Sequence, residues 1–240
     1  GYKTYKTKLQ EFLNSNRIVE LEWVDYKLQS VIVSAIISDE KKSPTSFSKI
    51  SKKEIEENYS VQDVPEYLSY LPSTTSYSEN GNGIGYNYLS IRGFDQRRIS
   101  VSINGIPQND PEDHNVYWLD FPDLLASTEL IQVQRGAGSG VVGYPAIGGS
   151  INIITSPFSD RPQMNLSTSV GSYNTKKYSV AFSSGLINNK YSIYTKLSQI
   201  SSSGYRNSSW SKLNSYHISA VRYDDKLTSQ INLYGGPISD

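Results

Sequence analysis

Apolar and polar residues alternate along the last third of the chain, in segments of about ten residues separated by short turns. In each segment every second residue is apolar or aromatic, and the residues between are mainly Ser, Asn, Lys and Gln. A period of two predicts β-strands with one apolar and one polar face. The residues expected on the apolar faces are Met164, Leu166, Thr168 and Val170, then Tyr178, Val180 and Phe182, then Tyr191, Ile193, Thr195 and Leu197, then Tyr216, Ile218 and Ala220, and last Leu227, Ser229, Ile231 and Leu233.

This alternation has two interpretations. It is typical of outer-membrane β-barrel strands, which present one face to lipid and the other to the lumen. A soluble β-sandwich with one buried face produces the same pattern. A second sheet of the same chain covering Tyr178, Val180, Phe182, Ile193 and Leu197 would favour the sandwich, whereas one bare apolar face would favour the barrel.

Residues 46–156 mix helical and strand patterns, which indicates an α+β unit. FSKI is an expected strand, and Ser51 with Glu54 forms a capping box that starts a short helix. Asp63 precedes a second helix in VPEYLSYL, where Pro65 falls in the first turn and Pro72 marks the end.

Strands and two long polar loops follow. Strands are expected in YLSIRGF and RRISVSI, and Asn104-Gly105 favours a type I′ hairpin turn. Residues 73–88 and 108–123 form the loops. DLLASTELIQVQRG predicts a helical turn and a strand, and SINIIT closes the unit near residue 156.

The glycine pattern GSGVVG at 138–143 invites a dinucleotide-binding interpretation. That site needs a helix directly after the glycines, because the helix N-terminus holds the pyrophosphate. Here YPAIGGSINIIT follows, and its Pro and paired Gly residues cannot propagate a helix. We therefore expect these glycines to permit tight packing between strands.

Composition narrows the function further. The chain of 240 residues has a formal net charge of zero, so nucleic acid is not an expected partner. It has no cysteine, which excludes disulfides and thiolate metal sites. No nucleophile–base constellation is recognisable, so we expect neither an enzyme nor a cofactor.

Several ordered motifs resemble the plug domain of the TonB-dependent outer-membrane receptors. They are KISKKEI, VPEYLSYLP, SIRGF, RRISVSINGIP and ELIQVQRGAGSGVVGYPAIGGSINIIT. The resemblance implies an α+β plug domain followed by antiparallel strands of an incomplete transmembrane β-barrel, in a family whose plug packs inside about 22 strands. NGIPQNDPEDHNVYW with QVQRGAGS resembles a ferric-citrate-receptor-like subgroup.

The resemblance divides the chain into four parts. Residues 1–27 resemble the end of a carboxypeptidase-regulatory-like β-domain, and residues 28–45 hold a TonB-box-like segment and a linker. The plug spans 46–156, and about five barrel strands span 157–240. Five strands cannot close a barrel, and open edges are costly in lipid, so we expect a piece of a longer receptor that transports nothing alone.

The resemblance implies energy-coupled uptake of a scarce small molecule at the bacterial outer membrane. An iron chelate, either a ferric siderophore or ferric citrate, is the expected cargo, with cobalamin or a glycan as alternatives. The expected partners are outer-membrane lipid and a TonB-type periplasmic protein. That protein would bind the extended segment Ser30, Val31, Ile32, Val33, Ser34 and Ala35 as an added strand. The alternative for this segment is an ordinary buried strand.

In such receptors the outward loops of the plug contact cargo. Rigid aromatic rings and amides suit that role, although each could instead pack its own loop. The candidates are Tyr77, Asn80, Tyr86, Tyr88, Gln108, Asn109, His114, Tyr117 and Trp118. Asp110, Glu112, Asp113 and His114 resemble a metal cluster, but Pro111 interrupts them and the EF-hand spacing is absent, so a solvated acidic loop is the preferred interpretation.

The resemblance also implies contacts between plug and barrel. In the family, plug arginines pair with barrel carboxylates, and residues without a Cβ allow close approach to the wall. The candidates are Arg92, Gly93, Arg135, Gly136, Gly148 and Gly149. A surface role for both arginines is the alternative.

Two other classes of function remain as alternatives. A soluble β-rich binding or adhesion module would use the same alternating strands without a membrane. An enzyme has no supporting constellation, and only turnover abolished by Arg92→Ala or His114→Ala would favour it.

Overall fold

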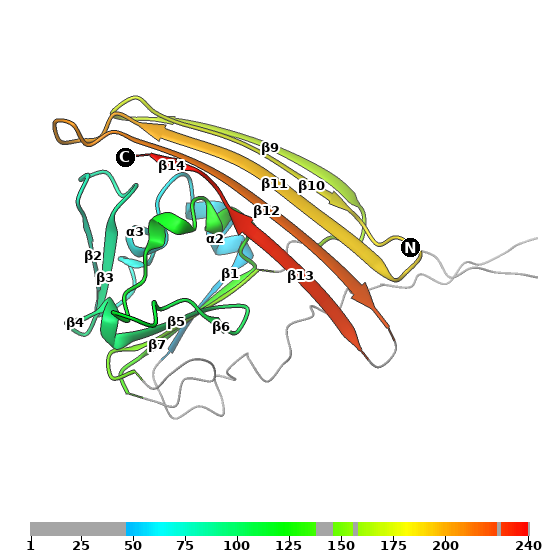
Figure 1. Ribbon diagram of the computed structural model, residues 1–240, viewed down its shortest axis with the longest axis horizontal. Coiled ribbons are helices and arrows are strands. Elements are labelled where there is room, and N and C mark those ends of the chain that lie inside the picture. Colours follow the sequence, from blue (N-terminus) through cyan, green and yellow to red (C-terminus); the bar gives the residue numbers. More distant parts are fainter. Residues whose placement is uncertain (1–46, 138–145, 156–157, 225–226, 240) are drawn as a thin grey trace, which may run out of the picture.

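A long curved β-sheet arches over a smaller α+β unit in the computed structural model (Figure 1). The structure describes residues 47–137, 146–155, 158–224 and 227–239. The expected β-domain remnant at 1–27, the segment Ser30–Ala35 and the glycine pattern at 138–143 lie outside the described residues.

Among the described residues, the α+β unit holds strands β1 to β8 and two α-helices. Its elements are β1 (Phe47–Ser51), α2 (Lys52–Asn58), α3 (Val64–Leu68), β2 (Thr74–Ser78), β3 (Asn87–Ile91), β4 (Phe94–Asp95), η1 (Gln96–Arg98), β5 (Ile99–Ile103), β6 (Ile106–Pro107), η2 (Trp118–Asp120), η3 (Leu124–Ser127), β7 (Leu130–Arg135) and β8 (Gly149–Ile154).

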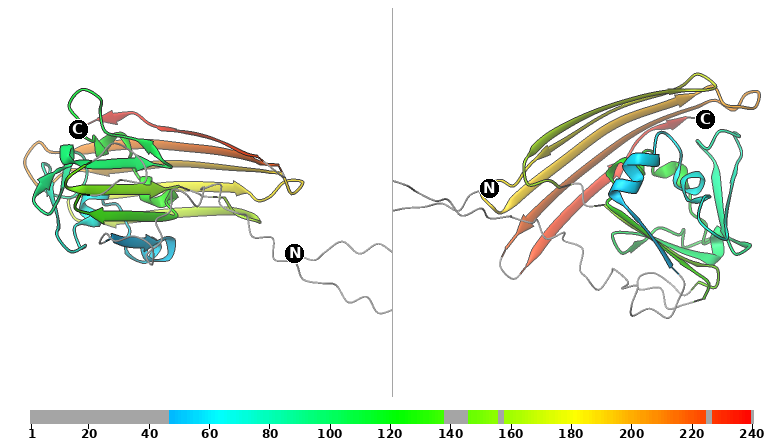
Figure 2. Two further views of the ribbon diagram at one scale, coloured as in Figure 1. Left: turned by 90° about the horizontal axis from the view of Figure 1, so that it is seen from below. Right: turned by 180° about the vertical axis from the view of Figure 1, so that it is seen from behind.

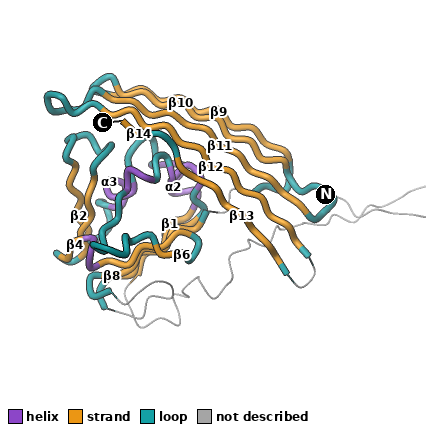
Figure 3. The backbone as a smooth tube through the Cα atoms, viewed as in Figure 1, coloured by secondary structure: helices purple, strands orange, loops and turns teal. Residues whose placement is uncertain are grey.

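The central sheet of this unit has the order β1-β7-β8-β5-β6. Strands β1, β7 and β8 pair antiparallel, whereas β5 and β8 pair parallel. β-Branched residues on β5, β7 and β8 face a core that α2, α3 and the 3₁₀ turns cover. Figure 3 shows the two helices between this sheet and the long sheet. The predicted α+β class of this unit is therefore confirmed.

Both helices start where the sequence predicts. Ser51 accepts a hydrogen bond from the Glu54 amide, and the Glu54 side chain returns one to the Ser51 amide, which completes the capping box. Asp63 precedes α3, and Pro65 lies in its first turn. α3 ends at Leu68, four residues before Pro72, because the chain continues through a tighter turn in which Leu71 N–H donates to Leu68 O.

The prediction of a loop over 73–88 was wrong at its start. Thr74–Ser78 is strand β2 and pairs with β3, with Tyr77 opposite Tyr88. β4 extends this pair to a three-stranded sheet. Only Thr74 of β2 is buried, so the strand needs few apolar residues. Its sequence is therefore as polar as that of a loop.

The long sheet is built from five extended antiparallel strands and a short sixth. Its order is β13-β12-β11-β10-β9, and β14 pairs with β12. The bounds are β9 (Pro162–Gly171), β10 (Thr175–Ser184), β11 (Tyr191–Ser202), β12 (Ser211–Tyr223), β13 (Thr228–Gly235) and β14 (Ile238–Ser239). The α+β unit lies against the concave face, as both views of Figure 2 show.

The two faces of the long sheet have opposite character, as the alternation predicts. Apolar side chains on the convex face are exposed, including Leu166 (74%), Phe182 (48%) and Leu197 (54%). Their neighbours on the concave face, such as Ser183 and Lys196, are buried against the α+β unit. The described residues place no second sheet over the convex face, so the barrel interpretation is confirmed and the sandwich is not.

The predicted turn at Asn104-Gly105 appears in the structure, and a second turn with left-handed backbone joins two strands of the long sheet. Asn104-Gly105 joins β5 to β6 with φ of 51° and 81°, as a type I′ turn requires. Asn188 and Asn189, between β10 and β11, have φ of 49° and 53°. Among the described residues, neither helix is long and apolar enough to cross a membrane.

The register defines the depth of each outward residue. The middle row of the convex face is Met164, Phe182, Thr195, Ile218 and Leu233, with apolar rows on both sides. Along β11 the outward face runs from Gln199 to Tyr191, about 27 Å of strand, or about 20 Å of depth at a tilt of about 40°. That height is close to the apolar band of about 25 Å in outer-membrane strands.

We therefore predict a depth-dependent cost of a charge on this face. Met164→Arg, in the middle row of β9, should lower the free energy of unfolding by about 2–4 kcal/mol in a bilayer. Thr168→Arg, on the same strand and face but near the rim, should cost at most about 1 kcal/mol. Urea titration of the full-length receptor in lipid vesicles measures both values, and equal costs would contradict a lipid-facing role.

Candidate functional site: the plug loops and their contact with the barrel strands

One buried glutamine joins strand β3 to the loop that follows β6. We name residues 79–86, between β2 and β3, the hairpin loop, and residues 108–117, between β6 and η2, the long loop. Gln96 Nε2 donates to Asn115 Oδ1 (2.6 Å) and to Val116 O (3.0 Å). Its Oε1 accepts from Leu89 N–H (3.3 Å) and from Trp118 Nε1 (3.1 Å). Sequence analysis missed Gln96, because nothing in RGFDQRR distinguishes a buried glutamine.

Exposed aromatic rings gather beside this junction. The rings of Tyr77 and Tyr88 stack with centroids 6.1 Å apart, and Tyr88 donates to Glu79 Oε1 (2.8 Å). A cavity of 330 Å³ is lined by both tyrosines together with Gln96, Arg97 and Asn115. Tyr86 and Tyr117 also remain exposed. The structure therefore exposes three of the predicted tyrosines, Tyr77, Tyr86 and Tyr117, while Tyr88 is half-buried and lines the cavity with Tyr77.

Asn80 has a different place from the one expected. Its side-chain amide donates to Ser211 Oγ (2.8 Å) on β12 and to Ile84 O (3.1 Å). Asn82 likewise donates to Ser202 Oγ (2.8 Å) on β11, and Tyr205 N–H donates to Asn80 O (3.2 Å). These bonds fix the hairpin loop to the ends of the barrel strands.

The remaining loop candidates mostly hold the long loop in shape. Asn109 accepts from Val101 N–H (2.8 Å) and donates to Ile99 O and His114 O (2.9 Å each), so it binds the loop to β5. Trp118 is 2% exposed within the core. The Gln108 amide donates to Ile106 O (2.8 Å), and His114 has a left-handed φ of 60°. A cargo role for these four residues stays a prediction that no contact supports.

The acidic run of the long loop caps its own turns. Asp110 Oδ1 accepts from Glu112 N–H (2.7 Å), and Asp113 accepts from Asn115 N–H (2.7 Å) and from Tyr117 OH (3.0 Å). No group of three potential metal ligands occurs in the described part of the chain. The interpretation as a solvated acidic loop without a metal ion stays a prediction.

The two predicted arginines lie together on the plug. Arg92-Gly93 is the turn between β3 and β4, with φ of 53° and 81°. The Arg92 guanidinium covers Gly136, where a Cβ would collide with it, and Arg135 Nη1 donates to Pro72 O (3.3 Å). These contacts lie within the plug, so pairing of either arginine with a barrel carboxylate stays a prediction.

The paired glycines Gly148 and Gly149 are crowded by the plug itself. A Cβ on Gly148 would stand 2.8 Å from Phe94 Cβ and 3.0 Å from Arg98 O. A Cβ on Gly149 would collide with Gln134 O of β7. Strand packing inside the plug therefore already requires glycine at both positions, and their approach to the barrel wall stays a prediction.

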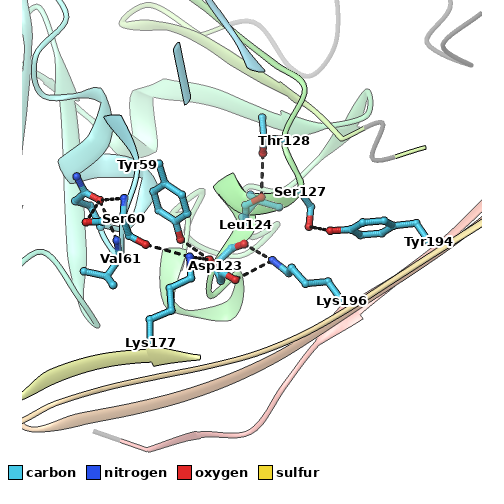
Figure 4. Close-up of polar contacts among 11 residues, drawn as sticks. Tyr59, Ser60, Val61, Asp123, Leu124, Ser127, Thr128, Lys177, Tyr194 and Lys196 are labelled. Atoms are coloured by element: carbon cyan, nitrogen blue, oxygen red, sulfur yellow. Dashed lines mark hydrogen bonds and ion pairs between the residues drawn. The ribbon is translucent and has the colours of Figure 1, made fainter. Parts of the chain in front are cut away.

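A buried carboxylate is the main polar contact between plug and barrel strands (Figure 4). Asp123, at the start of η3, is fully buried and has a left-handed φ of 55°. Its Oδ1 accepts from Lys177 Nζ of β10 (2.5 Å) and from Tyr59 OH (2.5 Å). Lys196 Nζ of β11 lies 3.2 Å from Oδ2 and also donates to Asp123 O. We call Asp123, Lys177, Lys196 and Tyr59 the lysine–aspartate cluster.

Each lysine also uses a plug carbonyl or ring. Lys177 Nζ donates to Ser60 O (3.0 Å) and lies 4.3 Å from the centroid of the Tyr59 ring. The side chains of Lys177 and Lys196 are 3% and 2% exposed, so water cannot replace these partners. Nearby, the hydroxyls of Ser127 and Tyr194 lie 3.2 Å apart and continue the contact between η3 and β11.

The charges of the two lysines decide the protonation of Asp123. Burial alone would raise the pKa of Asp123, but Lys196 and Lys177 lower it to about 2. The pKa of the Tyr59 hydroxyl is raised by its own burial and by the Asp123 charge, so Tyr59 remains a donor. Because the folded pKa of Asp123 lies below its usual value, this stabilisation is present above about pH 4 and is lost as the pH falls towards 2.

A second buried carboxylate joins the hairpin loop to helix α3. Asp63 Oδ2 accepts from Asn87 Nδ2 (2.6 Å) and Gly85 N–H (3.1 Å), and Asp63 N–H donates to Gly83 O (3.0 Å). Burial raises the pKa of Asp63 to about 8, although the hydrogen bonds from Asn87 and Gly85 act against that rise. Asp63 thus contacts the hairpin loop, and it lies only three residues after Ser60, whose carbonyl oxygen accepts from Lys177 of the lysine–aspartate cluster.

Removing the charge of Asp123 should loosen the plug. In Asp123→Asn both lysines stay buried without an anion, and we expect a loss of about 3–5 kcal/mol in the free energy of unfolding. Urea denaturation of the full-length receptor in detergent, followed by plug fluorescence, measures this loss. Asp120→Asn, at an exposed carboxylate three residues away, is the control and should change stability by less than about 0.5 kcal/mol. An Asp123→Asn cost below about 1 kcal/mol would show that the cluster does not hold the plug.

Asp63 should make stability fall with rising pH. Its folded pKa of about 8 exceeds the ordinary aspartate pKa of 3.8, so the folded state holds an extra proton between these values. Relative to Asp63→Asn, the native chain should lose about 1.4 kcal/mol per pH unit from pH 5 to 8 and then level off. Asparagine keeps a side-chain oxygen that can accept from Gly85 N–H and Asn87 Nδ2, so the variant should fold. Parallel stability profiles of the two proteins from pH 5 to 9 would refute the raised pKa.

The family comparison agrees with this geometry. Residues 39–150 match the family model described as the TonB-dependent receptor plug domain. An iron-regulated outer-membrane virulence protein of Vibrio cholerae is 36% identical over 121 residues, which are 47% of this chain and 17% of that protein. The vitamin B12 transporter of Vibrio cholerae is 28% identical over 155 residues, which are 64% of this chain and 25% of the transporter. The chain thus spans a quarter or less of the length of these two relatives.

A solved structure shows the same arrangement of plug and strands. The siderophore receptor PiuA of Acinetobacter baumannii superposes with a TM-score of 0.64 over 84% of this chain and 27% of that receptor, at 22% identity. At this identity the likeness establishes the fold. The iron-regulated virulence protein is named as an outer-membrane protein, and the bare apolar face of the long sheet is the surface that such a membrane requires. In this outer-membrane chain, a plug domain that matches the TonB-dependent receptor family model over residues 39–150 therefore precedes antiparallel strands of a partial β-barrel.

Proposed function

We propose that this chain acts in an outer-membrane receptor for energy-coupled uptake of a scarce small molecule, with the plug closing the barrel. The observation that carries the proposal is the buried contact between the plug and the polar concave face of the strands, centred on Asp123, Lys177 and Lys196. A plug fixed in this way blocks passage, and passage needs a force that moves it.

The cargo in this proposal is an iron chelate, either a ferric siderophore or ferric citrate. The cavity beside Tyr77 and Tyr88 supports a small-molecule site, because stacked rings give rigid contact area and Arg97 supplies a positive charge for an anionic chelate. The relatives also favour iron, since one is named as iron-regulated and PiuA is named as a siderophore receptor. The metal would arrive within its chelator.

The proposed energy source acts through the segment Ser30–Ala35. An extended, β-branched segment can add to the sheet edge of a TonB-type periplasmic protein through main-chain hydrogen bonds. Strand β1 follows this segment after a short linker and is the edge strand of the plug sheet, paired only with β7 among the described strands. A pull on the segment would therefore act first on β1 and α2, and then on Tyr59 and Ser60 of the contact with Lys177.

A soluble binding module is the other candidate, and the structure opposes it. Its apolar strand faces would need a cover, whereas Tyr178, Phe182, Ile193 and Leu197 are each more than 40% exposed. The relatives found by comparison are named as transport, receptor or outer-membrane virulence proteins, and none is named as an enzyme.

Uptake by the full-length receptor tests the proposal. Cells would receive ferric citrate, a ferric hydroxamate or a ferric catecholate labelled with radioactive iron. Val31→Pro removes a main-chain N–H from the proposed partner segment, so cargo binding should persist while uptake is lost. Val31→Thr keeps the N–H and the β-branch and should take up iron like the native receptor.

The outcomes separate the parts of the proposal. Uptake that resists a protonophore would refute energy coupling. Native uptake by Val31→Pro would refute the role of Ser30–Ala35. Uptake of none of the three chelates by the native receptor would refute an iron cargo of these classes.

A further inference from the structure

One row of the convex face carries two lysines at the rim of the apolar band. Lys176 on β10 pairs with Ser201 on β11, and Ser201 pairs with Lys212 on β12. These three residues, which we call the lysine row, point outwards because their parity matches Tyr178, Leu197 and Tyr216 on the same strands. Both lysines are exposed.

The lysine row has uncompensated positive charge. Within the part of the chain that the structure describes, no carboxylate forms an ion pair with Lys176 or Lys212. The opposite rim differs, since Asp224 lies 2.6 Å from Lys190 Nζ and 2.7 Å from Arg222 Nε. The two ends of the lipid-facing surface therefore differ in their attraction for anions.

The position of the row identifies the anion. The neighbouring outward row contains Tyr178 and Gln199, and the next contains Leu166, Val180, Leu197 and Tyr216. Aromatic residues at the edge of an apolar band mark the interface between lipid tails and headgroups. Lysines one row further out lie at headgroup level, where long side chains extend towards charged groups.

We propose that the lysine row binds the phosphate of a membrane lipid whose acyl chains lie on the apolar band. Lys176 and Lys212 stand two strands apart, about 10 Å between their Cα atoms, so both ammonium groups can approach a phosphate above Ser201. The Ser201 hydroxyl supplies a further donor. A strand tilt of about 40° separates the two lysines by about 6 Å in depth, which their flexible side chains can span.

This site also orients the chain in its membrane. Ser202 and Ser211, next to Ser201 and Lys212, accept the hydrogen bonds of Asn82 and Asn80 from the hairpin loop. The hairpin loop and the lysine row are therefore at the same end of the strands. The leaflet that supplies the phosphate lies on the side of the plug loops, independently of which cargo the receptor carries.

Lipid binding to the delipidated full-length receptor in non-ionic detergent tests this site. The probes are phosphatidic acid, diacylglycerol with the same acyl chains, and inorganic phosphate, and native mass spectrometry with thermal melting reports binding. Phosphatidic acid should bind the native receptor, and the double variant Lys176→Gln/Lys212→Gln should bind it about thirtyfold more weakly. Diacylglycerol and inorganic phosphate should not raise the melting temperature.

Two variants control for charge and folding. Lys190→Gln/Arg222→Gln removes the same charge from the opposite rim and should bind phosphatidic acid like the native receptor. Lys176→Arg/Lys212→Arg keeps the charge and should retain binding, which separates loss of the site from loss of the fold. Native affinity in Lys176→Gln/Lys212→Gln, or a loss confined to the opposite-rim variant, would overturn the proposal. Equal binding of diacylglycerol would show that the phosphate is not recognised, and saturation by inorganic phosphate would show a free-anion site in place of a lipid site.

Discussion

Two lysines on the concave face of the barrel strands are buried with a single carboxylate between them, and the seating of the plug depends on that pairing. An ammonium group cannot leave water without an anion or several acceptors, because the desolvation cost is several kcal/mol. Asp123 supplies the anion to both lysines, while Ser60 O and Asp123 O supply further acceptors. The left-handed backbone of Asp123 adds to the cost of placing it there, and such a conformation persists where surrounding contacts determine it. The plug therefore fits these strands in one position.

The strands can carry buried lysines only because their alternation is strict. A shift of one residue would turn Lys177 and Lys196 towards lipid and Tyr178 and Leu197 towards the plug. Charged side chains in lipid and apolar side chains against the polar plug contacts are both unfavourable. The lipid-facing and plug-facing residues therefore favour the same strand register. In this contact the carboxylate comes from the plug and the cations come from the barrel. The pairing implied by the family resemblance has the opposite polarity.

Features that depend on local sequence could be predicted. The capping box at Ser51, the Asn104-Gly105 turn and the two-residue period of the barrel strands each follow from a few neighbouring residues. Strand β2 was missed because its polar residues resemble a loop, and its pairing with β3 is decided by Tyr77 and Tyr88 across the hairpin. The lysine–aspartate cluster was missed for a different reason. Lys177 and Lys196 fall on the predicted polar face, but their partner lies 54 and 73 residues away, and no local pattern shows that separation.

Partners that are distant in sequence also decide which of the predicted loop residues line the cavity and which hold the loops in place. An amide or ring in a polar loop has the same sequence appearance whether it meets cargo or holds the loop. Asn109 and Trp118 serve the plug because β5 and Gln96 lie beside them, whereas Tyr77 and Tyr88 stack on each other and line a cavity. Asn80 and Asn82 instead bind the barrel strands, one residue from the lysine row. The hairpin loop thus touches both the cavity side of the plug and the barrel rim. A displacement of the plug would break the hydrogen bonds of Asn80 and Asn82 to the barrel strands as well as the ion pairs of Asp123. The hairpin loop and the lysine–aspartate cluster therefore both oppose movement of the plug, at two separate places on the barrel strands.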